Sequence, residues 1–349
     1  MIYQNLEFHN VAELQSVQNT AGLRLQRFPE SVRYSLGHGD HERGRFYAER
    51  SVGCEIRFVT DAPFFRITLS TVDNEGMVFI YKGSFLHAGY RLQPGLTTTL
   101  HVETPPKFDL VQPEVLEAPF SPRVWRILFG HEACFAFHHL ETFGHAVRPP
   151  QAGETPALRW LAYGSSITFG GNALLYTNTY IQQAAKRLGA DVSCKGMPGS
   201  CFCDPLMVRY ITEETDWDFI TLELGVNMRG RFNLTEFEER VRGLIRDVRA
   251  HHPGKPMVAI NIYPNGAVFQ KDQDDRIARD NLDFNRIVRQ IVSESDDPQL
   301  YFIDGSEILT DFSGLTTDLL HPSDDGHIRM GENLARRLGE ILKLSSVDS

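Results

Sequence analysis

The residues of this chain that could carry out chemistry are a serine in a glycine-rich turn and, far along the chain, an aspartate and a histidine three positions apart. Ser166 lies in residues 163–170, which read Tyr-Gly-Ser-Ser-Ile-Thr-Phe-Gly, and the distant pair is Asp318 and His321. A neutral serine hydroxyl is a weak nucleophile unless a general base takes its proton. An imidazole suits that task, and a carboxylate can fix its tautomer. We therefore predict that Ser166 attacks a carbonyl, with His321 as its base and Asp318 orienting His321.

Attack on a carbonyl also needs preorganised hydrogen-bond donors for the oxyanion that forms. The candidate donors are the backbone N–H groups of Ser166 and Gly196 and the side-chain amide of Asn227. A glycine at position 196 permits a backbone geometry that a side chain would hinder. Ser165, which directly precedes the predicted nucleophile, is a weaker candidate for the nucleophilic role.

Short apolar runs precede these residues and are typical of buried strands. The predicted strands are 160–163, 191–194, 219–224, 257–262 and 301–303, and the predicted helices are 178–188, 203–214, 235–251, 274–293 and 324–343. This alternation predicts a three-layer α/β/α domain with a central five-stranded parallel sheet of flavodoxin-like order. Ligands of such sheets bind beyond the carboxyl ends of the strands, so the candidate residues should meet at one edge.

Residues 1 to about 150 show a β-type pattern instead. The alternating segments are 55–60, 65–70, 77–81, 97–102 and 123–129, and Gly, Pro, Asn and Asp separate them. Short strands at this spacing predict an antiparallel, jelly-roll-like β-sandwich. The proline-rich stretch 147–158 is typical of a linker. We therefore predict an accessory β-sandwich domain at 1–150 and an α/β domain at 151–349.

The composition excludes several classes of partner. The chain has 349 residues, and its net charge of −10 argues against nucleic acid or an anionic membrane as the main partner. The N-terminus does not resemble a signal peptide, and no apolar run is long enough to span a bilayer. Five cysteines without framework spacing favour a reducing compartment, so we expect a cytoplasmic protein. The sequence does not determine the oligomeric state, and a homo-oligomer is possible.

Three groups of residues invite a metal interpretation, and we expect none of them to bind metal. His38, Asp40 and His41 lie in a glycine-rich loop, where solvated polar residues are common. His138 and His139 are adjacent in a predicted strand, so their side chains should point to opposite faces. The Cys201-x-Cys203 pair could bind metal or form a disulfide, but we expect buried thiols there. No cofactor is predicted.

The order of these motifs resembles a known family. The region from about 159 to 345 is similar to the SGNH hydrolases, or GDSL-type esterases. Their blocks centre on a serine in Gly-Asp-Ser, a glycine, an asparagine in Gly-x-Asn-Asp, and Asp-x-x-His. The matching residues here are Ser166, Gly196, Asn227, Asp318 and His321. The Tyr-Gly-Ser-Ser-Ile-Thr block behind a β-sandwich resembles a two-domain branch of the superfamily.

The sequence departs from the family pattern at three positions. Ser165 stands where the family has Asp before the nucleophile, Cys194 stands where the second block usually begins with Asn, and Met228 stands where Asp is common. No departure removes a predicted catalytic atom. Hydrogen bonds that the missing Asp would make must be supplied by another group.

The resemblance implies a serine esterase activity, and the two-domain branch is associated with carbohydrate deacetylation. We therefore expect an enzyme that removes a small acyl group, acetyl by preference, from a carbohydrate or similar alcohol through an acyl-enzyme on Ser166. One alternative is an acyltransferase that passes the acyl group to an alcohol, because at least one relative acts in this way. A second alternative is a carbohydrate-binding protein without catalytic activity.

Overall fold

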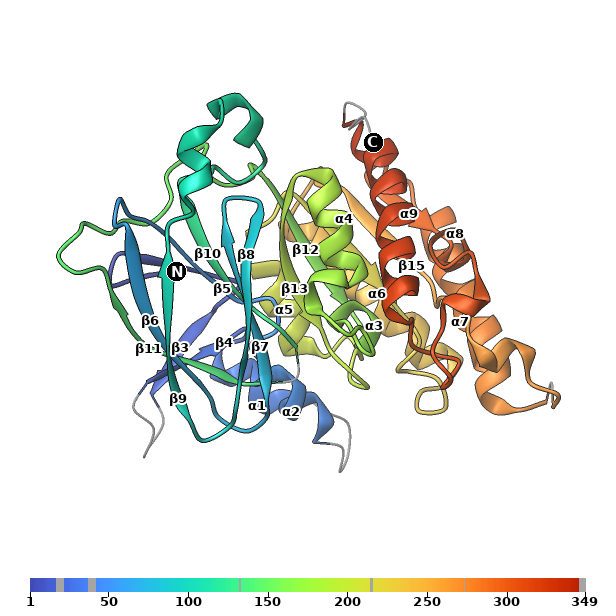
Figure 1. Cartoon of the computed structure of the whole chain (residues 1–349). Helices are drawn as coiled ribbons and strands as arrows, with labels where there is room; N and C mark the ends of the chain where they lie inside the picture. The colour runs from blue at the N-terminus through green and yellow to red at the C-terminus, as the bar shows by residue number, and fades with distance from the viewer. Residues whose placement is uncertain (17–21, 37–41, 132, 214–215, 273, 345–349) are drawn as a thin grey trace. The chain divides into compact units, whose positions relative to one another are not determined.

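The computed structural model of this chain describes residues 1–349 except 17–21, 37–41, 132, 214–215, 273 and 345–349 (Figure 1). The chain forms two compact units. The first contains residues 1–30 and 48–157, and the second contains residues 31–47 and 158–349. The domain boundary predicted between residues 150 and 151 stays a prediction, but residues 31–47 were not expected to join the later part of the chain.

The first unit is a sandwich of two antiparallel sheets. The six-stranded sheet has the order β1-β2-β5-β10-β7-β8 and consists of Ile2–Tyr3, Leu6–His9, Glu55–Val59, Val124–Phe129, Gly76–Lys82 and Phe85–Leu92. The five-stranded sheet has the order β3-β4-β11-β6-β9 and consists of Glu13–Ser16, Leu23–Gln26, Phe135–Glu141, Phe64–Thr71 and Thr97–Glu103. Two short 3₁₀ helices, η1 (Pro106–Leu110) and η2 (Pro113–Leu116), connect β9 to β10.

The core of this unit lies between the two sheets; burial alternates along strands such as β6, whereas the central strands β5 and β10 are buried at every position. In β6, for example, Phe65, Ile67 and Leu69 are buried, and the Phe65 ring packs edge-on against Trp125 of β10. This period of two is the pattern that predicted the sandwich, and the prediction is confirmed. The shorter strands β1 to β4 were not predicted because they offer too few residues for a period to be visible.

The strand β11 contains the histidine pair considered above. Its register against β6 shifts between Phe137 and His139, so the two histidines do not follow simple alternation. His138 Nε2 and Ser70 Oγ lie 2.8 Å apart, and His139 pairs with Glu141. Across the described ranges of the chain, no group of three or more potential metal ligands is present. His38, Asp40 and His41 lie outside the described residues.

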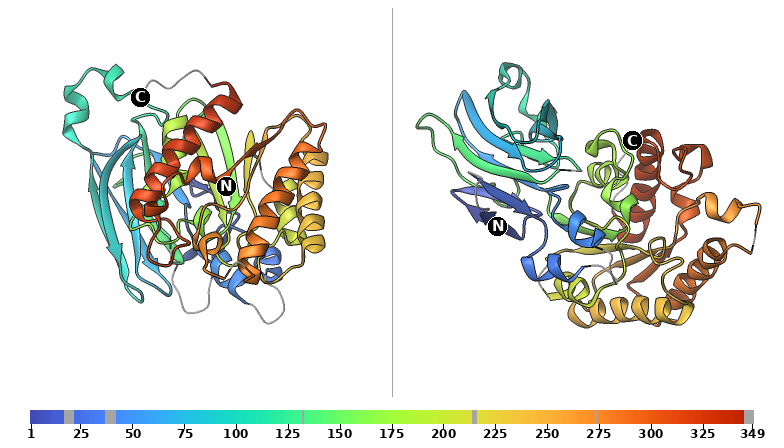
Figure 2. Two further views of the ribbon diagram at one scale, coloured as in Figure 1. Left: turned by 90° about the vertical axis from the view of Figure 1, so that its right-hand side faces the viewer. Right: turned by 90° about the horizontal axis from the view of Figure 1, so that it is seen from below.

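The second unit contains the predicted parallel sheet. The order β13-β12-β14-β15-β16 is the flavodoxin-like order, and the strands are Ala190–Gly196, Leu158–Gly164, Phe219–Glu223, Met257–Ile260 and Leu300–Ile303. The prediction of this fold is confirmed. The long helices are α4 (Tyr180–Leu188), α5 (Pro205–Glu213), α6 (Leu234–His251), α7 (Arg276–Ser293) and α9 (Asp324–Leu342). In Figure 2, α4 and α9 lie together on one face of the sheet, and α6 and α7 lie on the other.

Two short helices, α1 (Glu30–Ser35) and α2 (Arg43–Ala48), lie between β4 and β5 of the sandwich in sequence, but most of their residues belong to the second unit. The Tyr47 ring packs edge-on against Phe169 at 5.4 Å between ring centroids. The Arg43 side chain lies against Gly199. Among the helices that the structure describes, none is long and apolar enough to cross a membrane.

A buried ion cluster in the six-stranded sheet gives a test of stability. Glu55 is almost fully buried between Arg126 and Arg57, with hydrogen bonds of 2.5 and 3.0 Å to Arg126 and 2.7 Å to Arg57. Glu55→Ala leaves two arginines without their shared partner, so we expect the free energy of unfolding in urea to fall by about 3–5 kcal/mol.

The matched control is Glu75→Ala, which removes the partner of Arg91 in an exposed ion pair. Exposed pairs contribute about 0–1 kcal/mol, so this variant should unfold near the wild-type denaturant concentration. Equal losses in the two variants would contradict the importance of the buried cluster.

Candidate active site

The predicted nucleophile lies where β12 turns sharply into a short helix, α3 (Ser166–Phe169). Ser165 is the N-cap of this helix, with an extended backbone, and its Oγ accepts a hydrogen bond from the Ile167 N–H. Ser165 is fully buried, whereas Ser166 is half-buried. The Ser165 hydroxyl is buried and accepts the capping hydrogen bond of α3. Ser166 is therefore the better placed of the two serines to meet a substrate.

Ser166, His321 and Asp318 form one hydrogen-bonded chain. Ser166 Oγ and His321 Nε2 are 2.7 Å apart, and His321 Nδ1 and Asp318 Oδ2 are also 2.7 Å apart. Both distances are those of well-formed hydrogen bonds. The arrangement is that of a hydroxyl beside a base, with a carboxylate holding the second nitrogen of the base.

The loop that carries Asp318 and His321 is held by its own backbone. Leu315 and Pro322 form an antiparallel bridge, and the Thr316 N–H donates to the His321 carbonyl at 2.8 Å. Between the two functional residues, Leu319 has a φ of +55°, a left-handed conformation that costs a non-glycine residue energy. Surrounding contacts therefore hold the turn in the conformation that brings the His321 ring to Ser166 and Asp318 to the other side of that ring.

Asp318 is surrounded by donors. Its Oδ1 accepts hydrogen bonds at 2.9 Å from the backbone N–H groups of Leu320 and His321 and from the Thr316 hydroxyl. Burial opposes the charged form, but the hydrogen bonds from His321, Leu320 and Thr316 outweigh it and hold the pKa of Asp318 well below its ordinary value. The carboxylate is therefore ionised at neutral pH and available to stabilise an imidazolium on His321.

Gly196 lies at the end of β13, in register with Gly164 at the end of β12. A Cβ built on Gly196 would meet the backbone nitrogen of Phe169 at 2.3 Å. Only glycine therefore fits against the turn of α3 that begins at Ser166. This close approach supports the prediction that its backbone lies beside the reacting carbonyl, and the oxyanion role itself stays a prediction.

Asn227 lies in the loop after β14, and its Oδ1 accepts a hydrogen bond from the Cys201 N–H at 3.1 Å. The bond fixes which end of the side chain is the acceptor, and the opposite end carries the N–H donors that an oxyanion needs. Its role as an oxyanion donor, like that of the Ser166 N–H, stays a prediction.

The cysteines near this site are structural. All five cysteines of the chain are buried free thiols. The Cys203 N–H donates to the Tyr163 hydroxyl at 3.1 Å, and Cys201 Sγ lies 3.7 Å from the Glu223 carbonyl oxygen. Burial raises the pKa of Cys203 to about 12, so its thiol stays protonated and unreactive at neutral pH.

Glu223, the last residue of β14, was not singled out from the sequence. It is buried beneath the nucleophile turn, and its Oε2 accepts hydrogen bonds from the Ser165 N–H at 2.6 Å and the Thr168 hydroxyl at 3.1 Å. Within the part of the chain that the structure describes, its Oε1 has no hydrogen-bond partner. Burial raises the pKa of Glu223, while the bonds from Ser165 and Thr168 act in the opposite direction.

The sequence contained a signal for Glu223, namely a single carboxylate within the apolar run Phe-Ile-Thr-Leu-Glu-Leu. A charged residue in a fully buried strand is rare unless it is paired or hydrogen-bonded. The position of Glu223 also bears on the departure from the family pattern at Ser165, where the family has Asp. Position 165 has Ser where the motif has Asp; its hydroxyl accepts the Ile167 N–H, and Glu223 from the neighbouring strand accepts the Ser165 N–H.

The comparisons with known proteins agree with this geometry. Residues 162–329 match the model of the GDSL-like Lipase/Acylhydrolase family, and the chain carries a GDSL/SGNH hydrolase family domain in this region. The departures at Ser165, Cys194 and Met228 therefore lie within a domain that still belongs to the family. No curated protein is similar enough in sequence to count as a match.

Several solved structures share the two-part architecture. The Salicylyl-Acyltransferase SsfX3 from a Tetracycline Biosynthetic Pathway has a TM-score of 0.80 at 17% identity, covering 99% of this chain and 97% of its own. A family two carbohydrate esterase from Clostridium thermocellum, solved with cellohexaose, has a TM-score of 0.59 at 15% identity, covering 84% and 93%. The Acetyl Xylan Esterase Est2A from the rumen bacterium Butyrivibrio proteoclasticus has a TM-score of 0.55 at 14% identity, covering 83% and 90%. At these identities the likeness shows the fold alone.

The contacts of Glu223 lead to a prediction about stability. Glu223→Ala leaves the buried Ser165 N–H without its acceptor, so we expect the free energy of unfolding to fall by at least about 1–3 kcal/mol. Glu223→Gln keeps an oxygen that can accept this bond and should lose less. Urea denaturation of both variants measures the difference. Wild-type stability in Glu223→Ala would show that the carboxylate does not hold the nucleophile turn.

Proposed function

We propose that this protein is a serine esterase that removes a small acyl group, acetyl by preference, from a carbohydrate or similar alcohol. The observation that carries the proposal is the hydrogen-bonded chain from Ser166 Oγ through His321 to Asp318, with 2.7 Å at each step. The family domain supports ester chemistry in general, because SGNH hydrolases are generally esterases. The family two carbohydrate esterase and acetyl xylan esterase folds support a carbohydrate ester as the substrate.

The proposed mechanism uses groups of this chain alone. His321 Nε2 takes the proton of Ser166 as Oγ attacks the ester carbonyl, and Asp318 stabilises the imidazolium that results. The backbone N–H groups of Ser166 and Gly196 and the amide of Asn227 would stabilise the tetrahedral oxyanion. His321 then gives its proton to the leaving alcohol, and an acyl group remains on Ser166. Water, activated by the same imidazole, hydrolyses the acyl-enzyme and restores the serine.

Acyl transfer is the second candidate, and the likeness to the salicylyl-acyltransferase fold over 99% of the chain favours keeping it. The acyl-enzyme on Ser166 is the same in both reactions, and the difference lies in whether water or an alcohol attacks it. The third candidate, a carbohydrate-binding protein without activity, is disfavoured because a hydrogen-bonded Ser–His–Asp chain has no evident use in binding alone.

The nucleophile is tested by hydrolysis of p-nitrophenyl acetate. Ser166→Ala removes the atom that forms the acyl-enzyme, so we expect kcat/KM to fall by about 10⁴-fold or more. The matched control is Ser165→Ala, which deletes the neighbouring hydroxyl and loses a helix cap but keeps the nucleophile. If Ser166→Ala kept wild-type activity, or Ser165→Ala alone abolished it, the assignment of the nucleophile would be wrong.

The competition between water and alcohol acceptors separates the first two candidates. We expect p-nitrophenyl acetate incubated with added sugars or simple alcohols to yield free acetate as the main product, because the proposal is an esterase. Mass spectrometry of the products quantifies acetate and acetylated acceptor. An acetylated acceptor as the dominant product, absent with Ser166→Ala, would favour the acyltransferase.

A further inference from the structure

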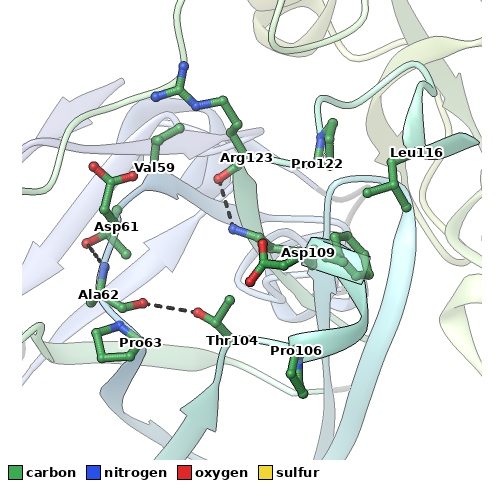
Figure 3. Close-up of a pocket in the computed structure, with 13 residues that line it drawn as sticks. Val59, Asp61, Ala62, Pro63, Thr104, Pro106, Asp109, Leu116, Pro122 and Arg123 are labelled. Carbon is green, nitrogen blue, oxygen red and sulfur yellow. Dashed lines mark hydrogen bonds between the residues drawn. The ribbon is translucent and has the colours of Figure 1, made fainter. Parts of the chain in front are cut away.

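The β-sandwich unit contains a cavity of about 570 Å³ (Figure 3). Its wall is formed by the loop after β5, the end of β7, the segment after β9 with η1 and η2, and the turn before β10. Every lining residue belongs to this one unit. The volume falls in the range of about 300–1,000 Å³ that small-molecule sites occupy.

Hydrogen bonds fix one wall of this cavity, which we call the sandwich cavity. The Thr104 hydroxyl donates to the Ala62 carbonyl at 3.0 Å, and the Thr104 N–H donates to the Pro63 carbonyl at 2.8 Å. The Ala62 N–H donates to the Thr60 hydroxyl at 3.2 Å. Figure 3 shows the Ala62–Thr104 contact beside Pro63. A wall held in this way is preorganised, so less conformational entropy is lost when a ligand binds.

Lys82 provides a buried donor in the sandwich cavity. The residue is only 8% exposed. Its Nζ donates to the Arg123 carbonyl at 3.3 Å and lies 4.6 Å from the centre of the Trp125 ring. An ammonium has three N–H donors, and these contacts use one of them in a long hydrogen bond. Burial lowers the pKa of Lys82 to about 8, with Asp61 acting in the opposite direction.

The charges that line the sandwich cavity balance. Asp61 and Asp109 contribute two carboxylates, and Lys82 and Arg123 contribute two cations. A ligand with a net charge of either sign would meet two like and two opposite charges and would gain no net attraction from the lining. The lining therefore suits an uncharged ligand whose groups can donate to carboxylates and accept from an ammonium.

Apolar surface lies between these polar groups. The apolar part of the lining consists of Pro63, Pro106, Phe108, Leu116 and Pro122. In Figure 3, Pro122 and Pro106 lie above and below Asp109, and Pro63 lies below Asp61. A ligand that matches this lining has hydroxyl groups at its edge and C–H groups on its faces, which is the chemistry of a sugar ring.

We propose that the sandwich cavity binds an uncharged carbohydrate segment, with Asp109 and Lys82 as its polar contacts. Sugar hydroxyls both donate and accept, so one sugar can satisfy a carboxylate and an ammonium together. Glycine betaine also matches the balanced charge and has methyl groups for the prolines and Phe108, but it has no N–H or O–H group to donate to Asp109. This inference does not depend on the chemistry of Ser166.

Isothermal titration calorimetry of the full chain with unsubstituted xylotriose, cellotriose and mannotriose tests the proposal. We expect at least one trisaccharide to bind the wild type, and Asp109→Ala to weaken that binding by about tenfold, the loss typical of one hydrogen bond to a charged group. The matched control is Glu114→Ala, which removes an exposed carboxylate of η2 that does not line the cavity. It should bind like the wild type.

A second variant, Lys82→Met, keeps the apolar stem and removes the ammonium, and it should weaken binding to a similar degree. Asp109 is exposed, so Asp109→Ala should unfold at the wild-type urea concentration, and the control Glu114→Ala should hydrolyse p-nitrophenyl acetate like the wild type. Activity therefore distinguishes a failure of this inference from a failure of the proposed esterase function. No binding of any trisaccharide, binding unaffected by both variants, or binding of glycine betaine in place of the sugars would overturn the proposal.

Discussion

The hydrogen bond between Ser166 Oγ and His321 Nε2 joins residues that are 155 positions apart in the chain. It can form because the strands of a parallel sheet all end at one edge, so that the loops that follow them meet there. The sheet order fixes which loops are neighbours, and the strained turn at Leu319 fixes how the last loop presents its histidine. Asp318 holds the other side of the His321 ring, and Glu223 holds the turn that carries Ser166.

The contacts beneath the turn at Ser165 and Ser166 show how this chain accommodates a serine where the family motif has an aspartate. A carboxylate from β14 accepts the Ser165 N–H, and Ser165 uses its hydroxyl to cap α3. A buried carboxylate carries a desolvation cost, which the bonds from Ser165 and Thr168 offset in part. The substitution at the second position of the motif is thus accompanied by a charged group in an otherwise apolar strand.

Much of this molecule could be predicted from its sequence. The parallel strands alternate with long helices, and the candidate residues lie at or after the carboxyl ends of such strands, so both the sheet order and the meeting of Ser166 with His321 followed from general rules. Glu223 could not be assigned a contact in the same way, because its partners Ser165 and Thr168 lie in the turn and short helix after another strand, and the sequence does not say which side chains meet there. The short strands of the sandwich and the helix α2 were missed because a few residues cannot display a period.

The assignment of residues 31–47 to the second unit has a consequence for how the protein can be divided. The chain leaves the sandwich after Glu30, contributes α2 to the hydrolase unit, returns at Ala48, and crosses again after Ala157. Three covalent crossings mean that no single cut separates two complete halves. A fragment that begins near residue 150 would lack Tyr47, and with it the aromatic neighbour of Phe169 next to the nucleophile helix. Replacing everything before the linker with another module would therefore also remove residues 31–47 from the second unit.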